Sequence, residues 1–473
     1  MNRNKELAKN TVIITLGKVC TQFISFFLLP LYTALLTTEQ YGAVDLVSTY
    51  VQLLLPIVIF QIDQAVFRYL IDKRKDLESE TELISSTLAF AFLQFILFTL
   101  LFSIILICFK IPYGWFLYIN VLAASLSSIF LQIVRGIGDN GSYAIASFLA
   151  GFFAVLLNVV FIAGLNMKAE GMMLATFLSN MICTVYIFFK KHIYRYISLK
   201  KISVQQIRKM LGYSLPLIPN ALSWWVVNAS DRSIVLLFLG TSANGVLAAS
   251  HKFSTMFTSI YNIFSLSWTE SASLHLKEAD GEAFFSNIVD TVYRLFVAVC
   301  IGIIACMPFV FPIMVNASYS EAYYQIPIYM IAGMFNVVAG LYGVVYIANR
   351  NTTAIAKTSI IAGVVNIIVN LALIQYIGLY AASISSAVAY GAMAVYRCFD
   401  IKKYLKPKIN KPILLSSIVV FTVITSIYYS QNLYLEVIGL IVTVLYALVI
   451  NFRFIISILR TIKGIIKRRH NDC

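Results

Sequence analysis

Asp231 and Arg232 stand side by side within the apolar stretch VVNASDRSIVLLFLG (226–240). A charged side chain at the centre of a membrane helix costs about 2.5 to 3.5 kcal/mol on insertion scales, so such residues usually face a partner or a water-filled cavity. Two interpretations of the pair are open at this stage. Either the two charges neutralise each other near the outer end of their helix, or Arg232 lines a cavity and binds an anion.

Similar polar residues recur on one helical face of other apolar segments. In segment 41–63, Asp45, Gln52 and Asp63 share a face, and the 18 residues between the two aspartates make five helical turns, roughly 27 Å. These two carboxylates are therefore expected near opposite mouths of one cavity. The other predicted cavity residues are Lys18 and Gln22 on the first segment, Asn220 and Asn228 on the seventh, and Lys252 and Asn262 on the eighth.

The types of these residues indicate what the cavity would bind. Lys and Arg hold phosphate oxygens strongly in a low-dielectric site, so Lys18, Arg232 and Lys252 predict an anionic head group such as a diphosphate. Lys18 is close enough to the end of its span to reach the cytoplasm instead, whereas Lys252 lies about two turns inside. The acidic residues of the set are Asp45, Asp63 and Asp231. Such groups carry protons or Na⁺ in pumps, so we expect them to couple transport to an ion gradient.

Two further charges lie at predicted cytoplasmic span ends. Arg68 and Glu270 are either ordinary interface charges or the rim of an inner mouth. The seven cysteines stand singly, with no CxxC and no metal-ligand spacing, and are interpreted as small buried residues. The sequence therefore predicts no catalytic residue, no metal site and no cofactor beyond a coupling ion.

The elements that must position these residues are membrane helices. The 473-residue chain is 60% hydrophobic and only 12% charged. Its apolar segments run to about 20 residues, the length of a helical span, rather than the ~10 residues of a barrel strand. There are about fourteen such segments. The sequence therefore predicts an all-α polytopic membrane protein.

Basic residues sort the predicted loops into two sides. If the N-terminus is cytoplasmic, the inner loops and the tail hold almost all loop Lys and Arg, and the outer loops hold only Lys110 and Lys168. Both termini are therefore expected in the cytoplasm. This bias explains the net charge of +15, because basic cytoplasmic loops orient the spans and are attracted to anionic membrane lipids. Because the charges are dispersed among loops, nucleic-acid binding is not expected.

Two pairs of segments indicate an internal duplication. LTTEQYGAVDL aligns with LGTSANGVLAA, which places Thr38 on Thr241 and Gly42 on Gly245. SFLAGFFAVLLN (147–158) aligns with SIIAGVVNIIVN (359–370). Each repeat holds six spans, an even number, so the two lobes should be related by a pseudo-two-fold axis along the membrane normal, with a central cavity.

The predicted organisation has four parts. Ser203 and Gln206 fit a capping box that begins an amphipathic helix between the lobes. The parts are an N-terminal lobe (1–190), a cytoplasmic amphipathic linker (191–211), a C-terminal lobe (212–400), and a final pair of spans with a basic cytoplasmic tail (401–473).

Three stretches resemble polysaccharide flippases of the multidrug/oligosaccharidyl-lipid/polysaccharide exporter superfamily. They are YAIASFLAGFFAVLLNVVFIAGLNMKAEGMMLATFLSN, ANRNTTAIAKTSIIAGVVNIIVNLALIQYIGLYAASISS and YSLPLIPNALSWWVVNASDRSIVLLFLG. The resemblance implies a bacterial cytoplasmic-membrane flippase that moves undecaprenyl-diphosphate-linked oligosaccharide units for O-antigen or capsule by alternating access. It also implies work alongside a polysaccharide polymerase and other assembly proteins. Many O-antigen flippases have twelve spans. A terminal pair like the one here is found in lipid II flippases, where it holds the lipid tail.

Other functions compete with this one. A lipid II flippase or a small-molecule cation antiporter would share the fold, and a membrane-embedded polymerase or transferase is a further alternative. The three predicted cavity cations argue against the antiporter. The short outer loops, none longer than about ten residues, argue against a polymerase, which needs an outer domain for its catalytic groups.

Overall fold

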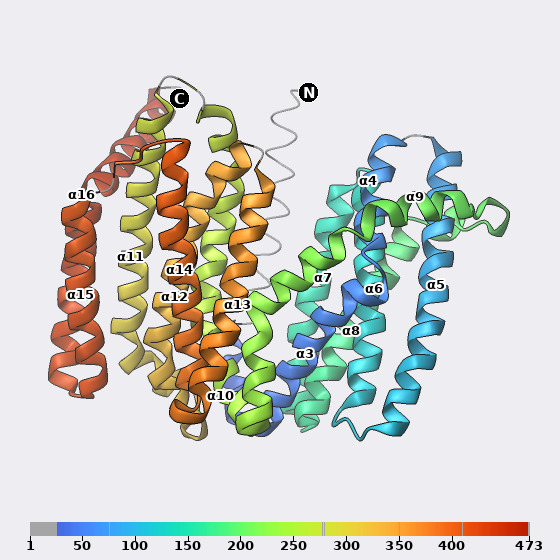
Figure 1. Cartoon of the computed structure of the whole chain (residues 1–473), viewed down its shortest axis with the longest axis horizontal. Helices are drawn as coiled ribbons and strands as arrows, with labels where there is room; N and C mark the ends of the chain where they lie inside the picture. The colour runs from blue at the N-terminus through green and yellow to red at the C-terminus, as the bar shows by residue number, and fades with distance from the viewer. Residues whose placement is uncertain are drawn as a thin grey trace. The chain divides into compact units, whose positions relative to one another are not determined.

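A computed structural model describes residues 26–74, 76–276, 278, 280–349, 351–408 and 410–471, except for the side chains of 227, 228, 266, 270, 273–275, 352, 453 and 457–471 (Figure 1). Over these ranges the chain is helical and contains no strand. The long helices are α3 (Thr38–Val58), α5 (Leu77–Cys108), α6 (Gly114–Gly136), α7 (Asn140–Asn158), α8 (Lys168–Lys190), α10 (Leu217–His275), α11 (Gly281–Met314), α12 (Glu321–Ala348), α13 (Thr352–Ile377), α14 (Tyr380–Asp400), α15 (Lys411–Ser430) and α16 (Leu433–Asn471). Shorter pieces include α2 (Leu29–Leu35), α4 (Ile62–Asp72), the π-helical turn η1 (Val159–Gly164) and α9 (Val204–Ser214).

Eleven helical segments of the described chain are long and apolar enough to cross a membrane. This confirms the predicted all-α polytopic membrane fold, whereas the count of fourteen spans stays a prediction. The first predicted span lies largely in residues 1–25, outside the described residues. The seventh and eighth predicted spans both fall in α10, and α14 is not among the eleven segments.

The chain forms two compact units, residues 1–249 and 250–473. In the first unit, α6 packs against α4 and α8, and α7 packs against α8. In the second unit, α14 packs against α12 and α13, and α11 packs against α12, α15 and α16 (Figure 1). The border between the units lies inside α10, because the first half of α10 contacts α3. The lobe boundaries predicted at 190 and 212 stay a prediction.

A break divides the predicted span 41–63 into α3 and α4. Phe60 and Gln61 adopt left-handed backbone conformations, with φ of 51° and 56°, one turn after Pro56. Bulky L-residues rarely adopt this conformation, because the Cβ approaches the following carbonyl oxygen. Asp45 on α3 and Asp63 on α4 therefore do not lie on one continuous helical face, contrary to the sequence-based expectation.

A second break separates the two halves of α10 at Gly240, where φ is 85° and ψ is −179°. Asn244 donates a side-chain hydrogen bond to the Arg232 carbonyl oxygen at 3.0 Å. In a straight helix, twelve residues would separate these positions by about 18 Å. The chain therefore reverses direction at Gly240, which separates the predicted seventh and eighth spans.

Matching burial accompanies the second pair of repeated segments. Asn158 at the end of α7 and Asn370 in α13 are equivalent in the alignment, and both are buried. The side-chain oxygen of each lacks a hydrogen-bond partner. The two copies thus bury the same polar residue at equivalent positions.

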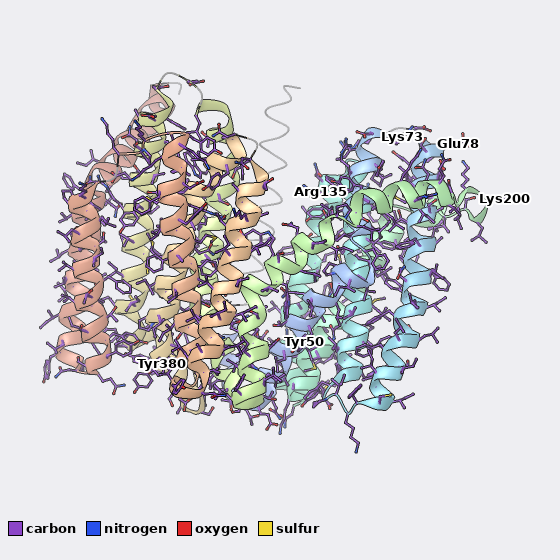
Figure 2. All side chains as sticks on the ribbon, in the orientation of Figure 1. Tyr50, Lys73, Glu78, Arg135, Lys200 and Tyr380 are labelled. Atoms are coloured by element: carbon purple, nitrogen blue, oxygen red, sulfur yellow. The ribbon has the colours of Figure 1, made fainter. Side chains whose placement is uncertain are left out.

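The predicted linker helix is present as α9. The Ser203 hydroxyl caps it by accepting from the Gln206 backbone N–H at 3.3 Å, which is the serine half of the predicted capping box. Met210 is fully buried where α9 packs against α4 and α5. The basic residues Lys73, Arg135 and Lys200 lie at the same end of the first unit as α9 (Figure 2).

Candidate functional site

A buried ionic cluster joins α3 to the first half of α10. Arg232 Nε donates to Asp45 Oδ2 at 2.7 Å, and Nη1 donates to Asp231 Oδ1 at 3.3 Å. Arg232 is 8% exposed and Asp231 is 5% exposed. The structure thus brings together three predicted site residues. The mutual neutralisation of Asp231 and Arg232 is present, and Asp45 is added to it from a different helix.

Among the described residues, the three charges of this cluster do not balance. One guanidinium faces two carboxylates, so the fully ionised trio carries a net charge of −1. Removing charges from water is expensive, and a buried ion pair offsets that cost only with good geometry and added hydrogen bonds. The Arg232 backbone N–H supplies one such bond to Asp231 Oδ1 at 3.0 Å. A guanidinium held by two carboxylates can exchange either of them for phosphate oxygens, since both bind its planar donors in the same way.

Beside the cluster, α3 and α10 make a close backbone contact. A Cβ atom added to Gly42 would overlap the Thr241 carbonyl oxygen and lie 2.7 Å from the Gly245 nitrogen. A Cβ atom added to Gly245 would overlap the Thr38 carbonyl oxygen and lie 2.7 Å from its carbonyl carbon. Thr38 Oγ1 and Ser242 Oγ lie 2.6 Å apart. Only glycine fits at either position.

This contact is reciprocal between the two sequence repeats. Thr38 aligns with Thr241 and Gly42 aligns with Gly245, and each threonine carbonyl faces the glycine of the other copy. An interface in which residue i meets j and j meets i is the signature of a two-fold axis. The duplication inferred from the sequence therefore has a direct structural counterpart where the two copies meet.

Further along, aromatic side chains extend the contact between α3 and α10. Trp225 Nε1 donates to the Thr49 carbonyl oxygen at 2.9 Å, and the Tyr50 hydroxyl lies 3.2 Å from Ser233 Oγ. The Tyr50 and Trp225 rings are 6.4 Å apart. Figure 2 shows Tyr50 in this region. The indole and phenol groups thus keep polar partners where α3 meets α10.

Asp63 lies in a different environment, at the first turn of α4. It is 3% exposed, and its Oδ2 accepts from the Ser128 hydroxyl at 2.8 Å and from Gln64 Nε2 at 3.0 Å. Its Oδ1 is buried without a hydrogen-bond partner. No cation among the described residues lies within ion-pair distance of it.

The remaining predicted residues are not brought together in this way. Lys252 is half-buried on the second half of α10, beside His251 in the second unit. Arg68 is exposed and pairs with Asp72 at 2.7 Å, an arrangement typical of a surface charge. Three predicted cavity amides are exposed: Gln52, Asn220 and Asn262. Lys18, Gln22 and the side chains of Asn228 and Glu270 lie outside the described residues.

The second unit holds a buried arginine that the sequence did not predict as a site residue. Arg397 on α14 is 5% exposed and donates to Thr358 Oγ1 at 2.7 and 3.0 Å, to Ser359 Oγ at 3.3 Å and to the Ala339 carbonyl oxygen at 3.0 Å. These neutral groups belong to α12 and α13. Arg397 therefore ties three helices together without a carboxylate partner among the described residues. Arg397 is the last residue of the predicted span 379–397. A basic residue at a span end usually lies at the membrane interface, so the sequence does not distinguish it from an ordinary interface charge.

A pocket of about 520 Å³ lies at the start of α11, away from the predicted site residues. Glu282 Oε1 and Ser286 Oγ accept from the backbone N–H groups of Lys406 and Lys408, both at 3.0 Å. These bonds hold the segment before α15 against α11. Within the described chain, no group of three or more His, Cys, Asp or Glu side chains is arranged to hold a metal ion.

The titratable side chain of Asp139 lies outside the spans, where it joins two helices. Asp139 caps α7 by accepting from the Ser142 N–H at 2.9 Å, and its carboxylate forms an ion pair with Lys191. Burial raises the pKa of Asp139, but the bonds from Lys191 and Ser142 outweigh burial and hold the pKa below its usual range. This pair joins the α6–α7 connection to the end of α8.

Solved structures of low sequence identity share the fold. A structure titled lipid II flippase MurJ, inward closed conformation, has 14% identity and a TM-score of 0.69, and the match covers 95% of this chain and 100% of that chain. An inward-facing multidrug resistance MATE family transporter of the MOP superfamily has 14% identity and a TM-score of 0.66, covering 84% of this chain and 98% of that one. A mutant of the Vibrio cholerae MATE transporter VcmN has 12% identity and a TM-score of 0.55, covering 85% of this chain and 98% of that one.

No curated protein matches the sequence. The family described as polysaccharide biosynthesis protein matches residues 7–268, more than half of the chain. This range includes both partners of the α3–α10 contact. The chain is therefore a multi-pass membrane protein that belongs to the polysaccharide biosynthesis protein family and has the fold of MATE transporters and MurJ.

Proposed function

We propose that this protein is a flippase that moves undecaprenyl-diphosphate-linked oligosaccharide units across the bacterial cytoplasmic membrane by alternating access. The observation that carries the proposal is the reciprocal contact of Gly42 with Thr241 and of Gly245 with Thr38. Alternating access needs a contact between the two repeats that closes one mouth and can separate. A contact made by small residues on equivalent helices meets this need, because it buries little side chain and can part without unpacking a core.

The position of the contact favours closure of the outer mouth. The segment LTTEQ, which includes Thr38, is predicted to lie outside the membrane. Asp45 is seven residues further along α3, roughly 10 Å deeper at 1.5 Å per residue. The ionic cluster therefore lies just below the glycine contact and reinforces it. Opening this mouth requires Arg232 to leave Asp45.

The cluster also supplies a means of recognising the substrate. A diphosphate presents the same oxygen geometry to a guanidinium as a carboxylate does, with more charge. A diphosphate that reaches Arg232 competes with Asp45 and loosens the link between α3 and α10. Lys252 is proposed as a second contact for the head group, and Lys18 as a third. Substrate arrival and opening of the outer mouth are coupled in this scheme through one side chain.

The C-terminal helix pair favours a lipid-linked substrate over a small cation. The match to the lipid II flippase covers 95% of the chain, against 84% for the MATE transporter. Helices α15 and α16 pack against α11 and expose a broad apolar surface. Its exposed side chains include Leu415, Val419, Ile441, Leu445 and Val449. We propose that this surface accompanies the polyprenyl tail while the glycan crosses.

Purified protein in proteoliposomes tests the function directly. A fluorescent lipid-diphosphate oligosaccharide is placed in both leaflets, and a membrane-impermeant quencher reports the fraction that reaches the outside. The proposal expects faster exchange than in protein-free vesicles, and loss of that exchange in Arg232→Ala. Equal exchange in vesicles with and without the protein would contradict the proposed function. In cells, deletion of the gene should leave lipid-diphosphate oligosaccharide on the inner leaflet.

Competing substrates give different outcomes in the same vesicles. Lipid II carries the same diphosphate, so preferential exchange of lipid II over oligosaccharide-linked donors would assign the chain to lipid II transport. Efflux of a cationic dye without lipid exchange would assign it to small-molecule antiport. Longer glycan chains formed from added units would indicate a polymerase or transferase.

A further inference from the structure

Tyrosine side chains gather at one end of the second unit. The connections from α11 to α12, from α13 to α14 and from α15 to α16 are predicted to lie outside the membrane, because they contain no Lys or Arg. Residues 315–324, 376–380 and 428–434 hold three, two and three tyrosines, eight of the 28 in the chain. The outer connections of the first unit at 109–113 and 165–167 hold one. A general aromatic belt at the membrane interface would surround both units, so this asymmetry indicates a local role.

Two pairs of neighbouring tyrosines join the beginning of α12 to the end of α15. The Tyr323 and Tyr428 rings stack, with centroids 4.1 Å apart and an angle of 10° between their planes. The Tyr428 hydroxyl donates to the Tyr323 carbonyl oxygen at 2.6 Å. One residue further along each helix, the Tyr429 hydroxyl donates to the Tyr324 carbonyl oxygen at 2.8 Å. These bonds hold the rings in place before any ligand arrives, which lowers the entropy cost of binding.

Tyr324 and Tyr429 form a parallel pair of rings. Their planes are 4° apart and their centroids 6.4 Å apart, so the two ring faces point the same way. Gln431 Nε2 donates to the Tyr324 hydroxyl at 2.6 Å, which places an amide at the edge of that ring. Tyr429 is 39% exposed, whereas its neighbour Tyr428 is 1% exposed. Tyr428 therefore anchors the end of α15, and Tyr429 presents its ring to the surface.

A third accessible tyrosine comes from α14. Ser383 Oγ donates to Gln325 Oε1 at 2.6 Å, which holds the beginning of α14 against the beginning of α12. Tyr380 begins α14 one turn before Ser383 and lies at the same end of the unit as the beginning of α12 (Figure 2). It is 37% exposed. Three helices of one unit thus each contribute a tyrosine to this end: Tyr324, Tyr380 and Tyr429.

The chemistry of this surface suits a sugar. The face of an aromatic ring carries partial negative charge, and tyrosine offers a large, rigid surface with few rotatable bonds. The C–H groups on one face of a pyranose ring carry partial positive charge and can pack flat on such a ring. Gln431, and Glu321 one turn before Tyr324, supply an amide and a carboxylate that can hydrogen-bond sugar hydroxyls. The three connections contain no Lys or Arg, the side chains that would favour a phosphate instead.

We propose that Tyr324, Tyr380 and Tyr429 form a platform that binds the glycan of the substrate on the outer side of the second unit. This role rests on the proposed function and assigns the two ends of the substrate to different parts of the chain. Arg232 in the first unit meets the diphosphate, and the tyrosine platform meets the sugar. Because the flipped unit must then leave with its lipid, the platform should bind the glycan weakly.

Saturation-transfer NMR on the full-length protein in lipid nanodiscs tests the platform. The probe is the free oligosaccharide that mild acid releases from the lipid-linked pool of the cells in which the protein naturally occurs. We expect magnetisation to pass from the protein to the C–H protons of the sugar. Tyr380→Leu and Tyr429→Leu should each raise the dissociation constant about three- to tenfold, as expected for the loss of one aromatic contact.

Two further variants serve as controls. Tyr429→Phe keeps the ring and should bind the oligosaccharide more tightly than Tyr429→Leu does. Trp115→Leu is the matched control for a general aromatic belt, because Trp115 is 62% exposed and lies at the beginning of α6, on the outer side of the first unit's spans. It should bind the oligosaccharide as the wild type does.

The outcomes separate the platform from its alternatives. No transfer to the oligosaccharide in the wild type overturns the platform, and so does undiminished transfer in both leucine variants. An equal loss in Trp115→Leu overturns it in favour of a general belt. If Tyr429→Leu does not fold, Tyr380→Leu decides alone, because it leaves the hydrogen bonds between α12 and α15 in place. Flipping is measured separately: glycan binding without flipping would refute the proposed function and leave the platform standing, and flipping without glycan binding would refute the platform alone.

Discussion

Gly245→Ala should weaken the closed contact between α3 and α10. The new Cβ would overlap the Thr38 carbonyl oxygen and lie 2.7 Å from the carbonyl carbon, whereas ordinary van der Waals contact begins at 3.4 Å. The two backbones must therefore separate by at least about 0.7 Å, since neither is the end of a flexible side chain. Overpacking of this kind costs about 1 to 3 kcal/mol. A cost of about 2 kcal/mol lowers the ratio of closed to open contact roughly 30-fold.

The closed contact can be measured by the rate of disulfide formation in the double variant Thr38→Cys, Ser242→Cys. The two side-chain oxygens lie 2.6 Å apart, and neither residue is buried, so an oxidant can reach both. The pair is introduced after the seven native cysteines have been replaced. We expect rapid cross-linking in membranes with glycine at 245, and at least about tenfold slower cross-linking with alanine there, as the shifted equilibrium requires.

Gly212→Ala supplies the matched control, because an added Cβ at that position meets nothing within 4 Å. It should cross-link at the parent rate. Gly42→Ala should behave like Gly245→Ala, because the contact is reciprocal. Both Gly42→Ala and Gly245→Ala could instead cross-link at the parent rate and support normal amounts of polysaccharide at the cell surface. That result would show that transport does not need the close approach of the α3 and α10 backbones, and it would refute the proposed gate.

Three other perturbations follow from named contacts. Arg232→Lys should restore less than about a tenth of the flipping lost in Arg232→Ala, because an ammonium group cannot reproduce the planar donors that hold Asp45 and Asp231. Full flipping in Arg232→Lys would mean that a positive charge alone suffices. Asp139→Asn should lower the free energy of unfolding at pH 7 by about 1 kcal/mol. Because the folded-state pKa of Asp139 lies below its usual range, this stabilisation is complete above the unfolded pKa near about 3.9 and is lost as the pH falls through the folded value. The difference between wild type and Asp139→Asn in thermal unfolding should therefore shrink below about pH 4, and a difference that grows there would refute the sign. Arg397→Met should lower the unfolding midpoint by several degrees, because it leaves hydroxyl and carbonyl partners on two other helices unsatisfied; the exposed Lys403→Met is the control and should not.

Helical periodicity located the polar residues but not their partners. Asp231 and Arg232 were recognisable from their charge in an apolar run, yet Asp45 is 187 positions away and nothing local links it to Arg232. The repeat alignment showed that Thr38 and Thr241 are equivalent. Equivalence does not reveal contact, because an alignment contains no information on how two copies are placed. The structure supplies that placement through the backbone overlap at Gly42.

Two features that the sequence did not predict have identifiable physical causes. Periodicity assumes an unbroken helix, and the break at Phe60 and Gln61 occurs at residues that normally favour helix or strand, so composition gives no warning beyond Pro56. Arg397 was missed because its partners are hydroxyl and carbonyl groups rather than carboxylates. A search for opposite charges cannot find such a residue. The contacts of Arg397 are tertiary, and no local pattern reveals them.

The break between α3 and α4 places the two aspartates in different contacts. Asp45 lies on the side of the break that contacts α10, and Asp63 lies on the side that packs against α6. If the span were one rigid helix, a movement of α3 away from α10 would carry α4 out of its packing with α6. With left-handed residues between them, α3 can tilt while α4 stays in place.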